Sequence, residues 1–176
     1  MKIVFYGGKQ AGVICLLSIM ARGDKIAMVI AQDEIVNRVA TAFGLLTILP
    51  TEIENNTFLS KLEKLKADLF VCAHGRKIIN DQILSLLRLG GINVHPCLYK
   101  YKGAKPIARL LKDNESRASV GVHYMTSKID SGEVIIELFE DVSECHTETE
   151  VYNKLYPLYA TAIKKALDII EGYTVE

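Results

Sequence analysis

The first half of the chain alternates short apolar runs with segments of helical periodicity, and this alternation constrains the fold more than any other feature. The apolar runs cover residues 2–6 and 25–31, and helical patterns follow them over about residues 11–21 and 34–43. Strands that alternate with helices favour a parallel sheet, because each parallel connection needs a crossover that a helix can supply. The sequence therefore predicts a Rossmann-like α/β fold of three layers, with helices covering the sheet.

The middle of the chain continues this pattern. An amphipathic segment near residues 57–66 leads into residues 68–73, whose continuous apolar character is typical of a strand buried on both faces. A helix predicted over about residues 80–89 ends at two glycines, and a strand follows over residues 92–94. This strand therefore ends at the stretch that holds the polar residues discussed below.

The second half adds antiparallel strands and a long helix. Residues 119–125 and 133–139 are predicted strands close enough in sequence to pair antiparallel, so we expect a mixed sheet that is mostly parallel. A capping box opens an amphipathic helix over residues 147–170, which Pro157 should kink or split. No repeat, low-complexity tract or linker is evident in residues 1–176, which predicts a single domain.

The charge balance and the cysteines exclude several classes of protein. The 176 residues carry 21 basic and 21 acidic side chains, which argues against non-specific binding to nucleic acid. The first apolar run is too short for a signal peptide or a membrane span, so we expect a cytoplasmic protein without membrane partners. The 4 cysteines form no CxxC pair, which fits reduced, buried thiols, and no ligand spacing indicates a metal site.

One polar pair stands at the end of a predicted strand, in the stretch INVHPCLYKYKGAKPI over residues 92–107. Asn93 and His95 are two residues apart, so a strand projects them from the same face, and Pro96 keeps His95 extended. Open α/β sheets bind ligands at this edge. An amide and an imidazole can together stabilise an oxyanion and move protons, as acyl transfer requires. A satisfied polar pair at a strand end explains the two residues equally well.

A carboxylate would complete such a site by orienting the histidine, and Asp130 in KIDSG is the best candidate. Asp-Ser-Gly is also an ordinary turn sequence, which explains Asp130 without a catalytic role.

A dinucleotide-binding protein is an alternative from a different class. Gly7, Gly8 and Gly12 precede a predicted helix, and Asp33 follows the second predicted strand, which is a loose dinucleotide-binding layout. The glycine pattern, however, is GGxxxG and not GxGxxG. Spacing by itself leaves the function open.

The second half resembles the folate-dependent formyltransferases in several motifs whose order and approximate spacing agree. The motifs are NVHP at residues 93–96, YKGAKPI at residues 101–107 and VGVHYMTSKIDSGEVI at residues 120–135. The first half agrees only in its βα pattern and glycine loop. The resemblance, nearest to sugar N-formyltransferases and the catalytic domain of methionyl-tRNA formyltransferase, implies the three-layer formyltransferase fold. It also implies transfer of a formyl group from 10-formyltetrahydrofolate to a primary amine, without a metal.

Carried over position by position, the resemblance implies a catalytic trio. Asn93 would bind the formyl oxygen, His95 would stabilise the tetrahedral oxyanion, and Asp130 would support His95 and relay a proton from the amine. His123 would at most contact these residues and would not touch the substrate. Two loops would form the walls of the folate site, and the residues expected to bind the folate are Arg76, Lys77, Ile79, Ser127, Lys128 and Ile129.

The acceptor side departs from the family pattern. The residues expected to bind the amine substrate are Lys9, Tyr101, Lys102 and Gly103. The loop after Pro96 is shorter than the family pattern by one residue and has Cys97 where serine is common. We interpret Cys97 as a small, partly buried thiol rather than a nucleophile.

The resemblance leaves several acceptors open, because the family formylates methionyl-tRNA, glycinamide ribonucleotide and nucleotide-linked amino sugars. Zero formal charge and the lack of a basic C-terminal domain disfavour the tRNA, and residues 6–13 lack the phosphate loop of the glycinamide ribonucleotide enzymes. We therefore expect a sugar nucleotide as the amine substrate, with the other two acceptors as alternatives. A non-catalytic folate- or dinucleotide-binding module is the alternative from a different class, and a homodimer stays open.

Overall fold

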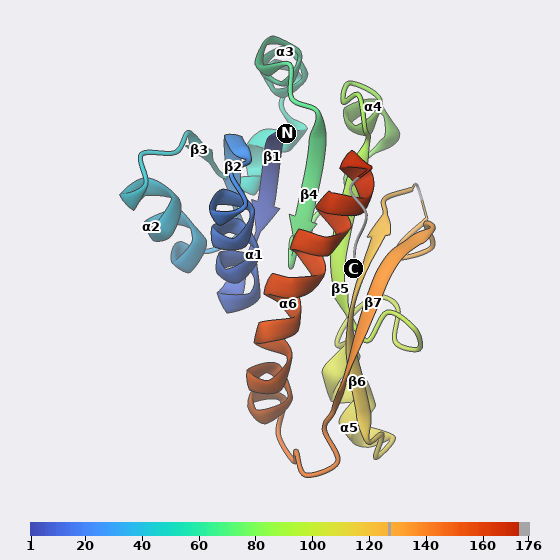
Figure 1. Ribbon diagram of the computed structural model, residues 1–176. Coiled ribbons are helices and arrows are strands. Elements are labelled where there is room, and N and C mark those ends of the chain that lie inside the picture. Colours follow the sequence, from blue (N-terminus) through green and yellow to red (C-terminus); the bar gives the residue numbers. More distant parts are fainter. Residues whose placement is uncertain (127, 173–176) are drawn as a thin grey trace.

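The computed structural model describes residues 1–126 and 128–172, which form one sheet flanked by helices (Figure 1). Within these residues, seven strands follow the order β3-β2-β1-β4-β5-β6-β7. The strands are β1 (Lys2–Gly7), β2 (Lys25–Ala31), β3 (Thr47–Ile48), β4 (Leu69–Ala73), β5 (Gly91–Pro96), β6 (Arg117–Tyr124) and β7 (Val134–Asp141). The helices are α1 (Lys9–Ala21), α2 (Glu34–Ala42), η1 (Pro50–Glu54), α3 (Asn56–Leu65), α4 (Asp81–Leu84), α5 (Pro106–Lys112) and α6 (Glu148–Glu171). The predicted α/β fold is confirmed.

The pairing of the strands places several loops at one edge of the sheet. β1 pairs in parallel with β2 on one side and with β4 on the other, and β4 pairs in parallel with β5. β6 pairs antiparallel with both β5 and β7, which confirms the mixed, mostly parallel sheet. The strand order changes direction at β1, so the loops that follow β1, β4 and β5 meet at the carboxyl edge of the sheet, where such folds bind ligands.

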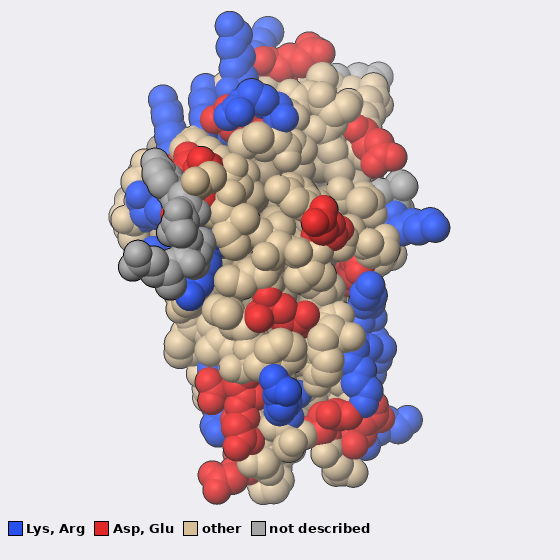
Figure 2. All heavy atoms as spheres, turned by 45° about the vertical axis from the view of Figure 1, so that its right-hand side comes forward, with Lys and Arg blue, Asp and Glu red and all other residues tan. Residues whose placement is uncertain are grey.

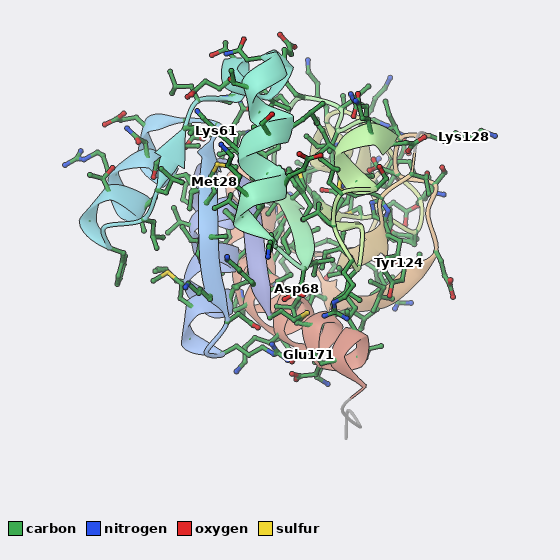
Figure 3. The ribbon with its side chains drawn as sticks, turned by 90° about the horizontal axis from the view of Figure 1, so that it is seen from above. Met28, Lys61, Asp68, Tyr124, Lys128 and Glu171 are labelled. Atoms are coloured by element: carbon green, nitrogen blue, oxygen red, sulfur yellow. The ribbon has the colours of Figure 1, made fainter. Side chains whose placement is uncertain are left out.

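Helices cover both faces of the sheet, as the three-layer prediction requires. α1, α2 and α6 pack on one face, in a core that includes Val94 of β5 and Val122 of β6. α3 and α4 pack on the other face, where Phe58 and Ile83 contribute to a core with Phe70 of β4. Figure 3 shows these two layers from above, with α3 and α4 on one side of the sheet and α6 on the other.

Some helices and strands differ from their predictions. A helix was expected over residues 80–89, but only Asp81–Leu84 is helical. The chain then continues in turns that are closed by hydrogen bonds between residues three positions apart. The N–H of Leu86 donates to Ile83 and that of Gly90 donates to Leu87, which directs the buried Leu87 into the core. The short strand β3 and the helix α5 were not predicted, since two and seven residues are too few to show a clear period.

α6 runs through Pro157 as one helix, so of the two expected effects a split is wrong, while a kink stays a prediction. Proline removes one backbone hydrogen bond from a helix. Leu155 and Tyr159 on either side of it are fully buried, and this packing holds the helix across the missing bond. The predicted capping box of Thr147 and Glu150 is present at its start.

Ion pairs attach the carboxyl end of α6 to the start of the sheet. The guanidinium group of Arg22, which follows α1, donates to Asp24 at 2.6 Å and to Asp168 at 2.7 Å, and it also pairs with Glu171. The amino group of Met1 lies 2.6 Å from the other oxygen of Asp24. α6 is therefore anchored at one end, and its opposite end lies at the cavity described below.

Charged side chains of both signs are interspersed on the face that carries β7. Figure 2 shows lysine, arginine and acidic side chains at both ends of this face, with isolated acidic groups on the largely uncharged surface between them. This distribution matches the balanced composition of 21 basic and 21 acidic residues. Across residues 1–126 and 128–172, no helix has both the length and the apolar character needed to cross a membrane.

Candidate active site

The carboxyl end of β5 carries the predicted polar pair. Val94 packs in the core beneath α6, so Asn93 and His95 project from the opposite face of the strand. β6 pairs antiparallel with β5 and places His123 directly opposite Asn93 and Gly121 opposite His95. Residues directly opposite in a sheet point to the same side. Asn93, His95 and His123 therefore share one face at the edge of the sheet.

The carboxylate of Asp130 is the centre of this cluster, because four groups converge on it. Asn93 Nδ2 lies 3.2 Å from Oδ1, and His123 Nε2 lies 3.3 Å from the same oxygen. The N–H of Gly103 donates to Oδ2 at 2.7 Å, and His95 Nε2 lies 3.0 Å from Oδ2. The fold thus brings Asn93, His95 and Asp130 into direct contact.

Asp130 remains ionised at neutral pH. Burial alone raises the pKa of a carboxyl group, but hydrogen bonds from His123, His95 and the Gly103 N–H outweigh burial and hold the pKa of Asp130 well below its usual range. Its negative charge is therefore available to orient the two imidazole rings and the amide of Asn93.

The turn that carries Asp130 depends on a close approach of two backbone segments. Asp130 adopts a φ of 48°, in the left-handed region that aspartate tolerates better than most residues. A Cβ added at Gly132 would lie only 1.8 Å from the carbonyl oxygen of Tyr124 at the end of β6. Glycine at position 132 is therefore required for the turn to fold back and place Asp130 beside β5.

His95 has one ring nitrogen without a partner. Its Nε2 lies 3.0 Å from Asp130 Oδ2 and 3.1 Å from the carbonyl oxygen of Gly103. Its Nδ1 is buried and has no hydrogen-bond partner among the described residues. Almost all buried polar atoms in proteins are paired, so Nδ1 has the capacity for one further hydrogen bond beside the cavity.

His123 contacts the trio more directly than the sequence indicated. Its Nδ1 lies 2.8 Å from the carbonyl oxygen of Tyr124, so Nδ1 carries a proton and donates it. Its Nε2 lies 3.3 Å from Asn93 Nδ2 and 3.3 Å from Asp130 Oδ1. With the proton on Nδ1, Nε2 is the acceptor that faces the amide of Asn93.

A cavity of about 560 Å³ opens beside the carboxylate of Asp130. Pockets for small molecules typically measure about 300–1,000 Å³. In addition to the trio, seven of the residues predicted to bind folate or amine line it: Lys9, Arg76, Lys77, Ile79, Gly103, Lys128 and Ile129. The structure thus places most of the predicted binding residues around one cavity.

Two of the predicted binding residues do not border the cavity. Tyr101 is 3% exposed and its hydroxyl donates to Asp113 at 2.8 Å, so its side chain packs in the interior. The carbonyl oxygen of Lys102 accepts a hydrogen bond from Arg109, and neither Tyr101 nor Lys102 borders the cavity. Ser127 lies outside the described residues. In this loop, the backbone of Gly103 is what reaches Asp130.

Cys97 is fully buried in the loop after β5, which agrees with its interpretation as a buried thiol. Burial raises the pKa of Cys97 to about 11. Since the thiolate is the nucleophilic form of cysteine, Cys97 is unreactive at neutral pH.

Sequence reasoning missed three lining residues on the side of α6, namely His74, Glu148 and Tyr152. His74 follows β4 with a φ of 62°, and its Nε2 lies 2.8 Å from the hydroxyl of Tyr159. The ring of Tyr152 lies 5.8 Å from that of His74, measured between ring centroids. The spacing of Glu148 and Tyr152 puts both on one helix face, but the sequence does not show which surface that face meets.

His74 should give the protein a measurable dependence of stability on pH. Burial, followed by the positive charges of Lys9 and His95, lowers the pKa of His74 to about 4. An unfolded histidine has a pKa of about 6.5, so the unfolded chain binds more protons between these values and stability falls as the pH falls through this window. We expect this group to lower the free energy of unfolding by about 2 kcal/mol between pH 7 and pH 5.

Urea denaturation of the wild type and of His74→Asn at both pH values measures this contribution. Asparagine tolerates the left-handed backbone at position 74 and does not titrate. The variant should therefore lose about 2 kcal/mol less than the wild type between pH 7 and pH 5. Equal losses in the two proteins would show that His74 does not titrate differently on unfolding.

Comparisons with known proteins agree with this geometry. The family described as formyl transferase matches residues 7–167. A methionyl-tRNA formyltransferase from Clostridioides difficile (strain 630) is 30% identical over 184 residues, which cover 97% of this chain and 60% of that protein. The chain therefore spans about 60% of the length of the curated relatives that it matches.

Two solved structures share the fold at low sequence identity. Glycinamide ribonucleotide transformylase 1 from Symbiobacterium toebii has a TM-score of 0.83 at 19% identity, covering 100% of this chain and 91% of that one. A formyltetrahydrofolate deformylase from Pseudomonas syringae pv. tomato has a TM-score of 0.79 at 18% identity, covering 97% of this chain and 61% of that one. The family match extends from the end of β1 through most of α6 and contains Asn93, His95 and Asp130. The chain belongs to the formyl transferase family.

Proposed function

We propose that this chain transfers a formyl group from 10-formyltetrahydrofolate to a primary amine. The observation that carries the proposal is the convergence of Asn93 and His95 on the ionised carboxylate of Asp130 beside a cavity of about 560 Å³. Membership of the formyl transferase family supports the reaction class. The arrangement has an amide donor, an imidazole and a carboxylate, which are the groups that acyl transfer to an amine needs.

In the proposed reaction, the amine nitrogen forms a bond to the formyl carbon, and the bond from that carbon to N10 of the folate breaks. The amine nitrogen loses one proton overall, and N10 gains one. Asn93 donates a hydrogen bond to the formyl oxygen, and His95 stabilises the negative charge that develops on it. Asp130 accepts the proton from the amine and orients His95 through the 3.0 Å contact with Nε2.

The lining of the cavity suits a folate. Ile79, Met125 and Ile129 supply apolar surface for a flat heterocycle, and they come from the loops after β4 and β6. Arg76 and Lys128 lie on the same two loops and suit the carboxylates of a folate tail. The two loops therefore offer both the apolar and the cationic contacts that such a molecule requires.

We propose a nucleotide-linked amino sugar as the acceptor, bound on the side of α1 and α6. Lys9 has no ion-pair partner among the described residues and suits a phosphate, while Glu148 can accept hydrogen bonds from sugar hydroxyls. Tyr152 offers an aromatic face beside them. The names of the related proteins make methionyl-tRNA and glycinamide ribonucleotide the alternatives to test.

A single assay separates these acceptors. 10-Formyltetrahydrofolate is incubated with the protein and with an aminated sugar nucleotide, glycinamide ribonucleotide, methionyl-tRNA or no amine, and the release of tetrahydrofolate is followed. We expect release only with an amine, and fastest with the sugar nucleotide. Mass spectrometry of the product should show one added formyl group.

Asn93→Ala serves as the control, because it removes the proposed donor to the formyl oxygen and should slow release by about 10²–10³-fold. Equal release with and without amine would indicate hydrolysis, the reaction named for the Pseudomonas neighbour, and would overturn the proposal. Fastest release with methionyl-tRNA or glycinamide ribonucleotide would keep formyl transfer but replace the proposed acceptor.

A further inference from the structure

The loop between β4 and α4 forms one wall of the cavity, and it folds around a buried tyrosine of β1. Tyr6 is fully buried and lies between Ile30 of β2 and Cys72 of β4 in the sheet. Gly75 passes directly over its ring, because a Cβ added at Gly75 would lie 2.4 Å from Tyr6 Cε1. The loop begins at His74, whose φ of 62° turns the chain across the end of β1.

The hydroxyl of Tyr6 is the hydrogen-bonding centre of this loop. It donates to Gln32 Oε1 at 2.5 Å, and it accepts the backbone N–H groups of Arg76 at 3.0 Å and Lys77 at 3.1 Å. Gln32 Oε1 also accepts the N–H of Arg76 at 3.0 Å. Burial raises the pKa of Tyr6, so the phenol keeps the proton that it donates to Gln32. One hydroxyl therefore fixes two consecutive amides of the loop.

These contacts also decide which groups of the loop can meet a ligand. The N–H groups of Arg76 and Lys77 point inward to Tyr6, so they are not free to donate into the cavity. Arg76, Lys77 and Ile79 all border the cavity, and the ammonium group of Lys77 also pairs with Glu54 at 2.5 Å. Tyr6 therefore removes two backbone donors from the groups that this wall can offer to a ligand.

We propose that Tyr6, with Gln32, is a positioning pair that holds the loop of residues 74–79 in the conformation that binds the folate co-substrate. The inference rests on the proposed function, because it takes this loop as a wall of the folate site. Neither residue borders the cavity, so the pair acts through the loop and does not touch the ligand. Loss of the hydroxyl should weaken folate binding while the contacts of Asn93, His95 and Asp130 remain in place.

Tyr6→Phe tests this role, because it keeps the ring under Gly75 and removes only the hydroxyl. Leaving buried donors without partners costs about 1–3 kcal/mol, and part of that cost falls on the loop conformation that binds folate. We expect the KM for 10-formyltetrahydrofolate to rise about tenfold, with kcat and the KM for the amine changed less than about twofold. Gln32→Leu, which removes the shared acceptor, should shift the same KM.

The matched control is Tyr99→Phe, which also removes one phenol hydroxyl. That hydroxyl donates to the carbonyl oxygen of Arg117 at 2.9 Å, away from the loop of residues 74–79. We expect all kinetic constants of this variant to match those of the wild type. An equal rise of both KM values in Tyr6→Phe, or no rise at all, would overturn the positioning role.

Amide hydrogen exchange separates failure of this inference from failure of the proposed function. In the protein without folate, the amide of Lys77 should exchange at least about tenfold faster in Tyr6→Phe than in the wild type, because the Tyr6 hydroxyl is its acceptor. The amide of Arg76 should change less, because it keeps its hydrogen bond to Gln32. Unchanged exchange would overturn the inference whatever the enzyme does. Calorimetry then measures the binding of tetrahydrofolate to the wild type. Faster exchange in the variant without binding to the wild type would show that Tyr6 holds the loop of residues 74–79 but that this loop is not part of a folate site.

Discussion

Replacing Asp130 with asparagine should lower kcat for formyl transfer by a factor on the order of 10³. The amide has no negative charge to orient His95, and its NH₂ group faces at least one of the groups that donate to the carboxylate, namely Asn93, Gly103 and His95. Both proton transfer from the amine and support of the imidazole are lost together. Single-turnover kinetics with excess enzyme measure the chemical step directly.

The pKa of Asp130 also predicts how Asp130→Asn changes the free energy of unfolding at different pH values. The pKa of Asp130 is lower in the folded protein than in the unfolded chain, so its contribution to stability is present above the unfolded pKa of about 3.9 and disappears as the pH falls through the folded value. Asp130→Asn should therefore be less stable than the wild type at pH 7, and the difference should shrink in acid. Urea denaturation at pH 7 and pH 3 compares the two proteins.

Asp113→Asn is the control for Asp130→Asn. Asp113 accepts the hydroxyl of the buried Tyr101 at 2.8 Å, which makes it a carboxylate with a buried partner that does not border the cavity. This variant should keep kcat within about twofold of the wild type. If Asp130→Asn turned over at the wild-type rate, the carboxylate would have no part in the chemistry.

Replacing Gly132 with alanine should have the second largest effect. The new Cβ would lie 1.8 Å from the carbonyl oxygen of Tyr124, and this oxygen belongs to the backbone at the end of β6, which cannot move as a side chain can. The turn must shift, and a displacement of about 1 Å at Asp130 can cost about 10²-fold in rate. We also expect a loss of about 3 kcal/mol in the free energy of unfolding, at the upper end for overpacking.

Gly44→Ala is the control for the general cost of removing a glycine. Gly44 has a φ of 65° and an added Cβ there meets no atom within 4 Å, so alanine should cost only about 1 kcal/mol and leave turnover unchanged. The comparison uses thermal unfolding together with the formyl transfer assay. A Gly132→Ala protein as active as Gly44→Ala would show that the turn tolerates the shift and that the position of Asp130 does not depend on this glycine.

The order of strands and helices was largely predictable because it depends on short-range patterns. The apolar run of β4 and the amphipathic period of α6 repeat over many residues, and both were found close to their predicted positions. β3 and α5 have two and seven residues, so neither presents enough of a period to be recognised. Pro157 does not split α6, because Leu155 and Tyr159 are buried on one face of the helix and hold it across the lost hydrogen bond.

The candidate site was predictable in part. The spacing of Asn93 and His95 before Pro96 places them on one strand face, and β5 confirms that geometry. Asp130 looked like an ordinary turn residue until the resemblance to a family singled it out, because nothing local distinguishes a catalytic aspartate from one that forms a turn. For Tyr101 the family motif suggested a binding role, but the side chain is buried and its hydroxyl contacts Asp113.

Local patterns in the chain are enough to predict the alternating strands and helices, the shared face of Asn93 and His95, and the turn that contains Asp130, because each depends on residues a few positions apart. The contacts of the Asp130 carboxylate with Asn93, 37 positions away, and with the N–H of Gly103, 27 positions away, depend instead on the folded arrangement of the whole sheet. Only the tertiary structure showed that the hydroxyl of Tyr6 holds the N–H of Arg76, which is 70 positions distant. Hydrogen bonds between such residues exist only after the sheet has paired, and no local pattern in the chain records which loops that pairing brings together.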